Sequence, residues 1–291
     1  MSFLQLRNAG VWEVIKRTAK GFSEHDLSTY AAALAYRALF SIFPFILFLL
    51  ALLGFLHLPD FFDWLRSQAD LLLPPVAMEQ VGPVIDQLQD SQGGLMSFGI
   101  LLALWTASIG VRSLMNAMNR VYAVEESRPS WKLVLLSVAY TVGLAVMLLL
   151  AAGFMTLGPQ VMSWLASQIG MEQMLVTLWT WIRWPLAILL MMLAVALIYY
   201  ATPDVEQDFR FITPGSVVAV IVWLAASIGF GIYVQNFGNY NATYGSIGAI
   251  IVLLLYFYIS AAVLLLGAQL NATIEHASAE GKDVGEKQLE D

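Results

Sequence analysis

The sequence contains no cysteine and very little charge for its length. Without cysteine the chain has no disulfide framework and no thiolate metal site. Charged residues make up 12% of the chain against 59% hydrophobic residues, and the mean hydropathy is +0.72. A soluble chain of this composition would expose far more apolar surface than it could bury. The composition therefore excludes an ordinary soluble domain and indicates that a bilayer is the solvent.

Aspartate, glutamate and histidine are absent from six long apolar runs. A helix of about 20 apolar residues crosses the ~30 Å hydrocarbon core, and an unneeded charge inside it costs several kcal/mol. Each run is long enough to cross a membrane. The runs lie at residues 34–56, 94–118, 133–158, 182–201, 213–235 and 244–270. Their lack of acids and histidines argues against a proton-coupled transporter of the relay type.

These runs predict an all-α, polytopic membrane protein with six transmembrane helices in a single membrane domain, residues 1–276. Residues 8–21 predict an N-terminal interfacial helix, because Trp12 and Ile15 occupy one side and charged residues spread around the rest. The small and charged residues 277–291 predict a disordered tail. The spans are expected at about 31–57, 94–118, 133–158, 182–201, 213–236 and 244–271.

The connection between the first two spans predicts an amphipathic helical hairpin on the outer side of the membrane. Residues 59–73 place aromatic and leucine side chains among acids, and Pro74 and Pro75 separate them from a second helical piece at residues 78–88. Cations are scarce in this connection. They gather instead before the first span and between the second and third, at Arg7, Lys16, Arg17, Lys20, Arg120, Arg128 and Lys132. Because cytoplasmic loops are enriched in lysine and arginine, both termini are expected in the cytoplasm.

Proline and glycine inside the spans are candidate packing or hinge positions. Pro44 removes a hydrogen bond from the first span and is expected to kink it. Four glycines flank the junction of the last two spans: Gly229, Gly231, Gly245 and Gly248. Small residues most simply allow close helix packing, and the alternative is a flexible lining.

Few polar residues lie at membrane depth. Arg37 lies one to two turns into the first span, where it either snorkels to the headgroups or holds an anion such as a lipid phosphate in its planar fork. Arg112, Asn116, Asn119 and Arg120 recur at helical spacing at the end of the second span and therefore share one face. That face is either a polar wall for substrate or a solvated helix end. The candidate substrate-binding site consists of Arg37, Arg112, Asn116 and Asn119.

The sequence lacks the residues that several kinds of chemistry require. There is no Gly-x-x-x-x-Gly-Lys-Ser/Thr loop, so no nucleotide-driven activity is expected. His25, His57 and His276 are isolated, and no nucleophile and base pair stands out, so neither a metal, a cofactor nor an enzyme activity is expected. A basic groove with interleaved aromatic residues for RNA is also missing, so no nucleic acid partner is expected. The expected partners are membrane lipids and either a second copy of the chain or an envelope protein.

Two blocks of the sequence, residues 30–44 and 242–271, resemble the most recognisable blocks of the BrkB/YihY family, and the likeness extends to Pro214, Gly215 and Trp223. This resemblance implies a bacterial inner-membrane protein with about six spans. Members of the family are described as transporters, are linked to envelope phenotypes, and were long mislabelled ribonuclease BN.

The chain departs from the family pattern at two positions in the last span. Where relatives commonly carry tryptophan and glutamate, this chain has Tyr256 and Gln269, so a carboxylate role at the second position is not expected here.

Three functions follow as hypotheses. The preferred one is a transporter or lipid-handling protein whose substrate passes through a groove lined by the first, second, fifth and sixth spans. An envelope scaffold that recruits partners without transport is the alternative. An ion channel has less support, since the sequence shows neither a charged ring nor a selectivity-filter pattern.

Overall fold

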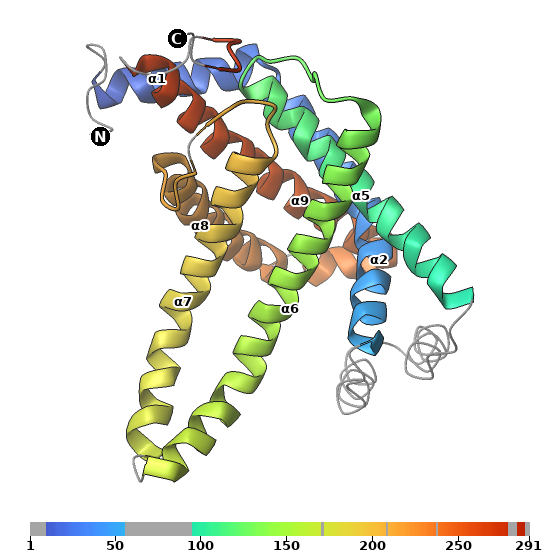
Figure 1. Cartoon of the computed structure of the whole chain (residues 1–291), viewed down its shortest axis with the longest axis vertical. Helices are drawn as coiled ribbons and strands as arrows, with labels where there is room; N and C mark the ends of the chain where they lie inside the picture. Colours follow the sequence, from blue (N-terminus) through green and yellow to red (C-terminus); the bar gives the residue numbers. More distant parts are fainter. Residues whose placement is uncertain are drawn as a thin grey trace.

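The computed structural model describes residues 10–55, 95–169, 172–207, 209–236, 238–278 and 284–288. Six helices in these ranges are long and apolar enough to cross a membrane, and each contains an apolar segment of 21 to 28 residues. They are α2 (Leu27–Phe55), α5 (Leu95–Val121), α6 (Ser130–Ile169), α7 (Glu172–Ala201), α8 (Pro214–Asn236) and α9 (Gly238–Ala277), shown in Figure 1. The prediction of an all-α, polytopic membrane protein is confirmed. The predicted outer hairpin at residues 59–88 lies outside the described residues.

Two helices continue well beyond the predicted spans. Helices α6 and α9 have 40 residues each, which is about 60 Å at ~1.5 Å per residue and twice the thickness of the hydrocarbon core. A hydropathy run ends where polar residues begin, whereas a helix continues through polar residues that tolerate helical backbone. Figure 1 shows the hairpin of α6 and α7 reaching past the ends of the other helices.

Helix α1 (Val11–Glu24) is short and has three distinct sides. Val14, Thr18 and Gly21 are buried, and α1 packs against α9. At about 100° per residue, the exposed apolar residues Val11, Trp12 and Ile15 form the neighbouring side. The charged residues of α1 lie on the opposite side. An apolar side and a charged side facing in opposite directions are typical of a helix that lies in a membrane surface.

The helices pack most tightly at the end of the bundle that carries α1, called here the α1 end. Helix α2 lies between α5 and α9, α8 packs on α9, and α6 pairs with α7 and contacts α5 (Figure 1). Fully buried side chains from α2, α5 and α9 form the core at this end: Leu27, Ala117, Met118, Val121, Leu265 and Ala272. This core fixes the helix ends that carry the candidate site.

Helices α8 and α9 cross closely at Gly215 and Gly267. A Cβ atom added at Gly267 would lie 2.6 Å from the Gly215 carbonyl oxygen and 2.8 Å from the Cβ atom of Ala219. The Gly215 amide donates to Asn271 Oδ1 at 2.8 Å, and Asn271 Nδ2 donates to Thr213 Oγ1 at 2.9 Å. Both glycines are therefore required for this crossing, which holds the start of α8 against the last turns of α9.

The predicted packing or hinge residues have different surroundings. Gly229 and Gly231 lie on α8, where an added Cβ atom would meet nothing within 4 Å. Gly248 is buried in α9, and Gly245 lies in the same helix. Pro44 lies inside α2. Neither Gly229 nor Gly231 faces a neighbouring helix, so the close packing that small residues allow occurs at Gly215 and Gly267 instead.

Polar residues of the connections at the α1 end form a hydrogen-bonded group, called here the loop network: Asn119, Glu126, Ser127, Arg128 and Asp204. Arg128 pairs with both carboxylate oxygens of Glu126 at 2.7 Å. Burial alone would raise the pKa of the Glu126 carboxyl, but the hydrogen bonds from Arg128 outweigh it and lower the pKa below its usual value. The network ties the connection after α5 to the connection after α7.

Residues 284–288 of the predicted tail pack on the loop network. Lys287 Nζ donates to Asp204 Oδ2 at 2.7 Å, and the same oxygen accepts the Ser127 hydroxyl at 2.6 Å. Burial would raise the pKa of Asp204, but these bonds prevail and lower it to about 2. The predicted disorder of the tail stays untested at residues 279–283 and 289–291, which lie outside the described residues, whereas residues 284–288 are held by these contacts.

Candidate anion site between α2 and α5

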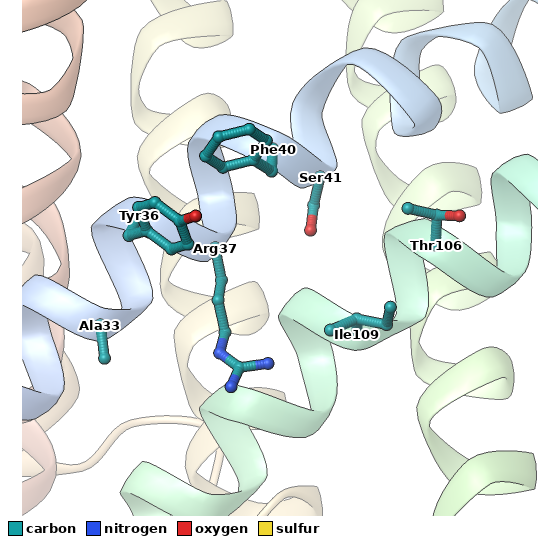
Figure 2. A pocket seen from close by; sticks show the side chains of 7 residues that line it. All are labelled: Ala33, Tyr36, Arg37, Phe40, Ser41, Thr106 and Ile109. Carbon is teal, nitrogen blue, oxygen red and sulfur yellow. The ribbon is translucent and has the colours of Figure 1, made fainter.

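A groove of about 480 Å³ opens between α2 and α5. Its lining residues are Ala33, Tyr36, Arg37, Phe40 and Ser41 from α2, and Thr106 and Ile109 from α5 (Figure 2). The α2 residues are spaced three or four apart and therefore form one face of the helix. An added Cβ atom at Gly110 would lie 3.0 Å from Ser41 Oγ. Helices α2 and α5 are thus in close contact at Ser41, beside the groove.

Arg37 supplies the charge in this groove. Its side chain extends from α2 toward α5 (Figure 2) and is exposed. Among the described residues, Arg37 has no hydrogen-bond or ion-pair partner within 4 Å. The rings of Tyr36 and Phe40 also line the groove, with their centroids 4.7 Å apart, and the Arg37 guanidinium extends away from both rings (Figure 2). The groove therefore presents a guanidinium and two exposed aromatic rings from one helix.

Arg112 lies one turn beyond Ile109 on α5 and does not line the groove. Its Nη1 donates to Ser108 Oγ and to Ser137 Oγ, both at 3.3 Å. Its Cζ lies 5.1 Å from the centroid of the Trp105 ring. Arg112 is therefore held by neutral hydroxyls and an aromatic ring, which leave its charge uncompensated.

Each arginine lies inside one of the apolar helix segments that are long enough to span a membrane. Arg37 lies ten residues after the start of Leu27–Leu49, and Arg112 lies nine residues before the end of Ile100–Val121. At ~1.5 Å per residue these distances are about 15 Å and about 14 Å. An arginine side chain at this depth either reaches toward the headgroups or binds an anionic group.

The other two predicted site residues do not line the groove. Asn116 is exposed on α5. Asn119 is 3% exposed, and its side chain donates to Glu126 Oε2 at 2.9 Å and accepts from the Asp204 amide at 2.7 Å. Asn119 therefore belongs to the loop network. Of the four predicted site residues, Arg37 lines the groove, whereas Arg112 binds Ser108 and Ser137.

Sequence reasoning missed the neutral residues that surround the two arginines. Ser41 and Ser108 could have been predicted from the sequence, because each lies four residues from an arginine on the same helix. Ser137 was not, because it comes from α6 and only tertiary packing brings it to Arg112. No group of three or more histidine, aspartate or glutamate side chains that could hold a metal ion occurs in the described part of the chain.

Comparison with known proteins supports the assignment suggested by the sequence blocks. A family model described as Virulence factor BrkB matches residues 18–290. YfkH of Bacillus subtilis (strain 168), described as a ribonuclease-like protein, is 34% identical over 261 residues that cover 89% of this chain and 94% of that protein. A UPF0761 membrane protein of Xanthomonas oryzae pv. oryzae (strain PXO99A) is 27% identical over 256 residues.

The Xanthomonas match covers 87% of this chain and 58% of that relative, so the chain spans little more than half of the longer protein. No solved structure matches the chain. The family model, by contrast, covers nearly the whole sequence, and together with the long apolar helices it shows that this chain is a membrane protein of the BrkB family.

Proposed function

We propose that this protein handles anionic lipids: it binds their headgroups in the groove between α2 and α5 and moves them along its apolar helices. The observation that carries the proposal is the guanidinium of Arg37, which lines a groove between two apolar helices and has no ion-pair partner among the described residues. A planar guanidinium fork binds phosphate oxygens in two parallel hydrogen bonds. The exposed rings of Tyr36 and Phe40 offer an apolar path for acyl chains beside that charge.

The proposed location is the bacterial inner membrane, with the α1 end in the cytoplasm. Exposed cations collect at this end, both on α1 and where α5 ends and α6 begins: Lys16, Arg17, Lys20, Arg120 and Lys132. This distribution agrees with the excess of lysine and arginine in cytoplasmic loops. The proposed site would then meet lipids of the cytoplasmic leaflet.

The ribonuclease-like description of YfkH is not extended to this chain. Hydrolysis of RNA requires clustered carboxylates or histidines that hold metal ions or activate water. The groove between α2 and α5 is instead lined by an arginine, hydroxyls and aromatic or aliphatic side chains. These groups suit binding of an anion, and we propose neither an enzyme activity nor a nucleotide as energy source.

The test is native mass spectrometry of the full chain released from its own membrane, as wild type and as the double variant Arg37→Gln and Arg112→Gln. Wild type is expected to retain anionic lipids in preference to zwitterionic ones. Each lost charged hydrogen bond is worth about 1.5–3 kcal/mol, so the double variant should lose this preference by more than tenfold.

The matched control is Arg120→Gln on the same helix α5. The Arg120 guanidinium donates to the His25 carbonyl oxygen at 3.3 Å and lies outside the groove. This control should keep the lipid preference of wild type. If the double variant inserts normally and keeps its bound anionic lipids, the proposal is wrong, and the envelope scaffold becomes the better hypothesis.

A further inference from the structure

We propose that the ligand of the groove between α2 and α5 is a lipid with a phosphodiester of one negative charge and a neutral headgroup that carries hydroxyl groups, as in phosphatidylglycerol. This inference rests on the proposed lipid-binding function and names its substrate class. It follows from two features of the groove, its single charge and the two hydroxyl side chains that lie beyond that charge.

The charge of the groove limits the charge of the ligand. Among the described residues that line it, Arg37 alone is charged, and Tyr36 carries the other titratable group. A phosphodiester with one negative charge compensates one guanidinium. A zwitterionic lipid would leave a positive charge, because its ammonium meets no carboxylate in this lining, and a phosphomonoester with two charges would leave a negative one. Either remaining charge is costly beside the apolar surface of membrane-spanning helices.

Two hydroxyl side chains line the groove beyond Arg37. Ser41 lies about one turn after it on α2, and Thr106 belongs to α5 on the other side of the groove (Figure 2). Counted from the α1 end, Ser41 is 14 residues into the apolar segment Leu27–Leu49. Thr106 is 15 residues into Ile100–Val121 from the same end. The two hydroxyls therefore lie at a similar level, roughly 21–23 Å along their helices.

The hydrogen bonding of Thr106 indicates which part of a lipid it can bind. Its hydroxyl donates to the Leu102 carbonyl oxygen at 2.8 Å, so its proton is already used and its oxygen remains as an acceptor. Phosphate oxygens are acceptors as well and cannot bond to it. A headgroup hydroxyl can donate to Thr106 Oγ1 and can exchange a second hydrogen bond with Ser41, whose hydroxyl donates or accepts. An ammonium could also donate, but its positive charge would add to that of Arg37.

The surroundings of the groove favour a lipid over the same headgroup free in water. Exposed apolar side chains continue along α2 beside the groove: Tyr36, Phe40, Phe43 and Leu47. Their spacing of three or four residues places them on one face of the helix. Acyl chains can follow this face while the headgroup lies in the groove, whereas a soluble glycerophosphodiester has no chains to place there.

The experiment titrates lipids with the same acyl chains into the full-length protein and measures binding by native mass spectrometry. Phosphatidylglycerol is compared with phosphatidylpropanol, which has the same charge and a headgroup of similar size without hydroxyls, and with zwitterionic phosphatidylethanolamine. Hydrogen bonds of the headgroup should favour phosphatidylglycerol over phosphatidylpropanol by roughly fivefold. The match of charge should favour both of them over phosphatidylethanolamine by roughly tenfold.

Single substitutions separate the two features of the site. Arg37→Gln should remove the preference over phosphatidylethanolamine. Thr106→Val, which replaces the hydroxyl with a methyl group, should remove only the preference over phosphatidylpropanol, and Ser41→Ala should act in the same way. The matched control is Ser113→Ala on α5, because this hydroxyl donates to the Ile109 carbonyl oxygen at 3.1 Å and Ser113 does not line the groove. The control should keep both preferences.

Each other outcome overturns a stated part of the inference. Equal binding of phosphatidylglycerol and phosphatidylpropanol, both favoured over phosphatidylethanolamine through Arg37, would refute the hydroxyl-bearing headgroup and leave the anionic-lipid function intact. Tighter binding of phosphatidate than of phosphatidylglycerol would refute the single charge. Equal binding of all these lipids would refute both the inference and the proposed function. Displacement of phosphatidylglycerol by excess glycerophosphoglycerol, the headgroup without acyl chains, would show that the ligand is not a lipid.

Discussion

Replacing Gly267 with alanine tests whether the crossing of α8 and α9 stabilises the α1 end. The added methyl group would lie 2.6 Å from the Gly215 carbonyl oxygen and 2.8 Å from Ala219 Cβ. It would also collide with the Tyr199 hydroxyl, which donates to the Leu264 carbonyl oxygen at 2.7 Å. The first obstacle is backbone, so rotation of a flexible side chain cannot relieve the contact, and the two helices must separate.

The expected loss of stability follows from three terms. Overpacking costs about 1–3 kcal/mol, and loss of the Tyr199 hydrogen bond costs about 1 kcal/mol. The higher helix propensity of alanine offsets up to about 1 kcal/mol of this loss. The net loss of about 1–3 kcal/mol corresponds to a fall in Tm of roughly 2–12 °C, at about 2–4 °C per kcal/mol.

Gly231→Ala is the matched control, because it adds the same methyl group where nothing lies within 4 Å. Alanine is favoured over glycine inside a helix by about 0.5–1 kcal/mol, so its Tm should rise by roughly 1–3 °C. The assay is thermal unfolding in detergent followed by the fluorescence of the nine tryptophans. Thiol-reactive dyes are unsuitable, since the chain has no cysteine. An unchanged Tm for Gly267→Ala, or an equal loss in both variants, would refute the proposed close crossing.

Three further predictions concern the α1 end and the orientation of the chain. The folded pKa of Asp204, about 2, lies below its unfolded value of about 3.9, so the side chain stabilises the fold above pH ~4 and this contribution is lost as the pH falls toward 2. Asp204→Asn should therefore lower the free energy of unfolding by about 2 kcal/mol at neutral pH and should have little effect on it near pH 2. An equal loss at the two pH values would contradict this role of the Asp204 carboxylate. Spin labels on Ile15→Cys and Arg17→Cys should report lipid and water respectively, and equal water exposure would show that α1 does not lie in the membrane surface. A membrane-impermeant maleimide should label Ser167→Cys in intact cells and Glu125→Cys only after lysis, and the reverse pattern would invert the proposed orientation.

The sequence was sufficient for the membrane fold because hydropathy acts over a whole helix. A run of about 20 apolar residues without acids indicates a transmembrane helix. Because acids and histidines are absent from all six runs, each run was predicted as a span. Hydropathy does not predict which residues of two neighbouring helices are in contact. Gly229 and Gly231 were predicted as packing or hinge residues because they flank the junction of the last two spans, but that position does not say which side of α8 faces α9. The close contact lies at Gly215, where the polar side chain of Asn271 also binds the backbone.

The candidate site was predictable in part for a related reason. Arg37 and Arg112 were identified because a charged residue near the membrane core requires an explanation, and the structure places Arg37 in the groove between α2 and α5. Asn119 was predicted on the same face of α5 as Arg112. The connections after α5 and α7 cover it, however: its amide nitrogen donates to Glu126, and its amide oxygen accepts from the Asp204 backbone. Spacing along a helix locates a side chain on a face but cannot show which loop covers that face.

The chain treats its arginines in two opposite ways, and this contrast supports a ligand in the groove. In the loop network, Arg128 is compensated by Glu126 at 2.7 Å and by Asp204 at 3.5 Å. Such pairing is the ordinary solution for a partly buried guanidinium, because its desolvation must be offset by a nearby anion. The described residues offer Arg112 only hydroxyls and an aromatic ring, and they offer Arg37 in the groove no carboxylate. Acids are available elsewhere in the sequence and are used a few turns away, so an anionic ligand such as the proposed lipid headgroup would supply the counter-charge that Arg37 lacks.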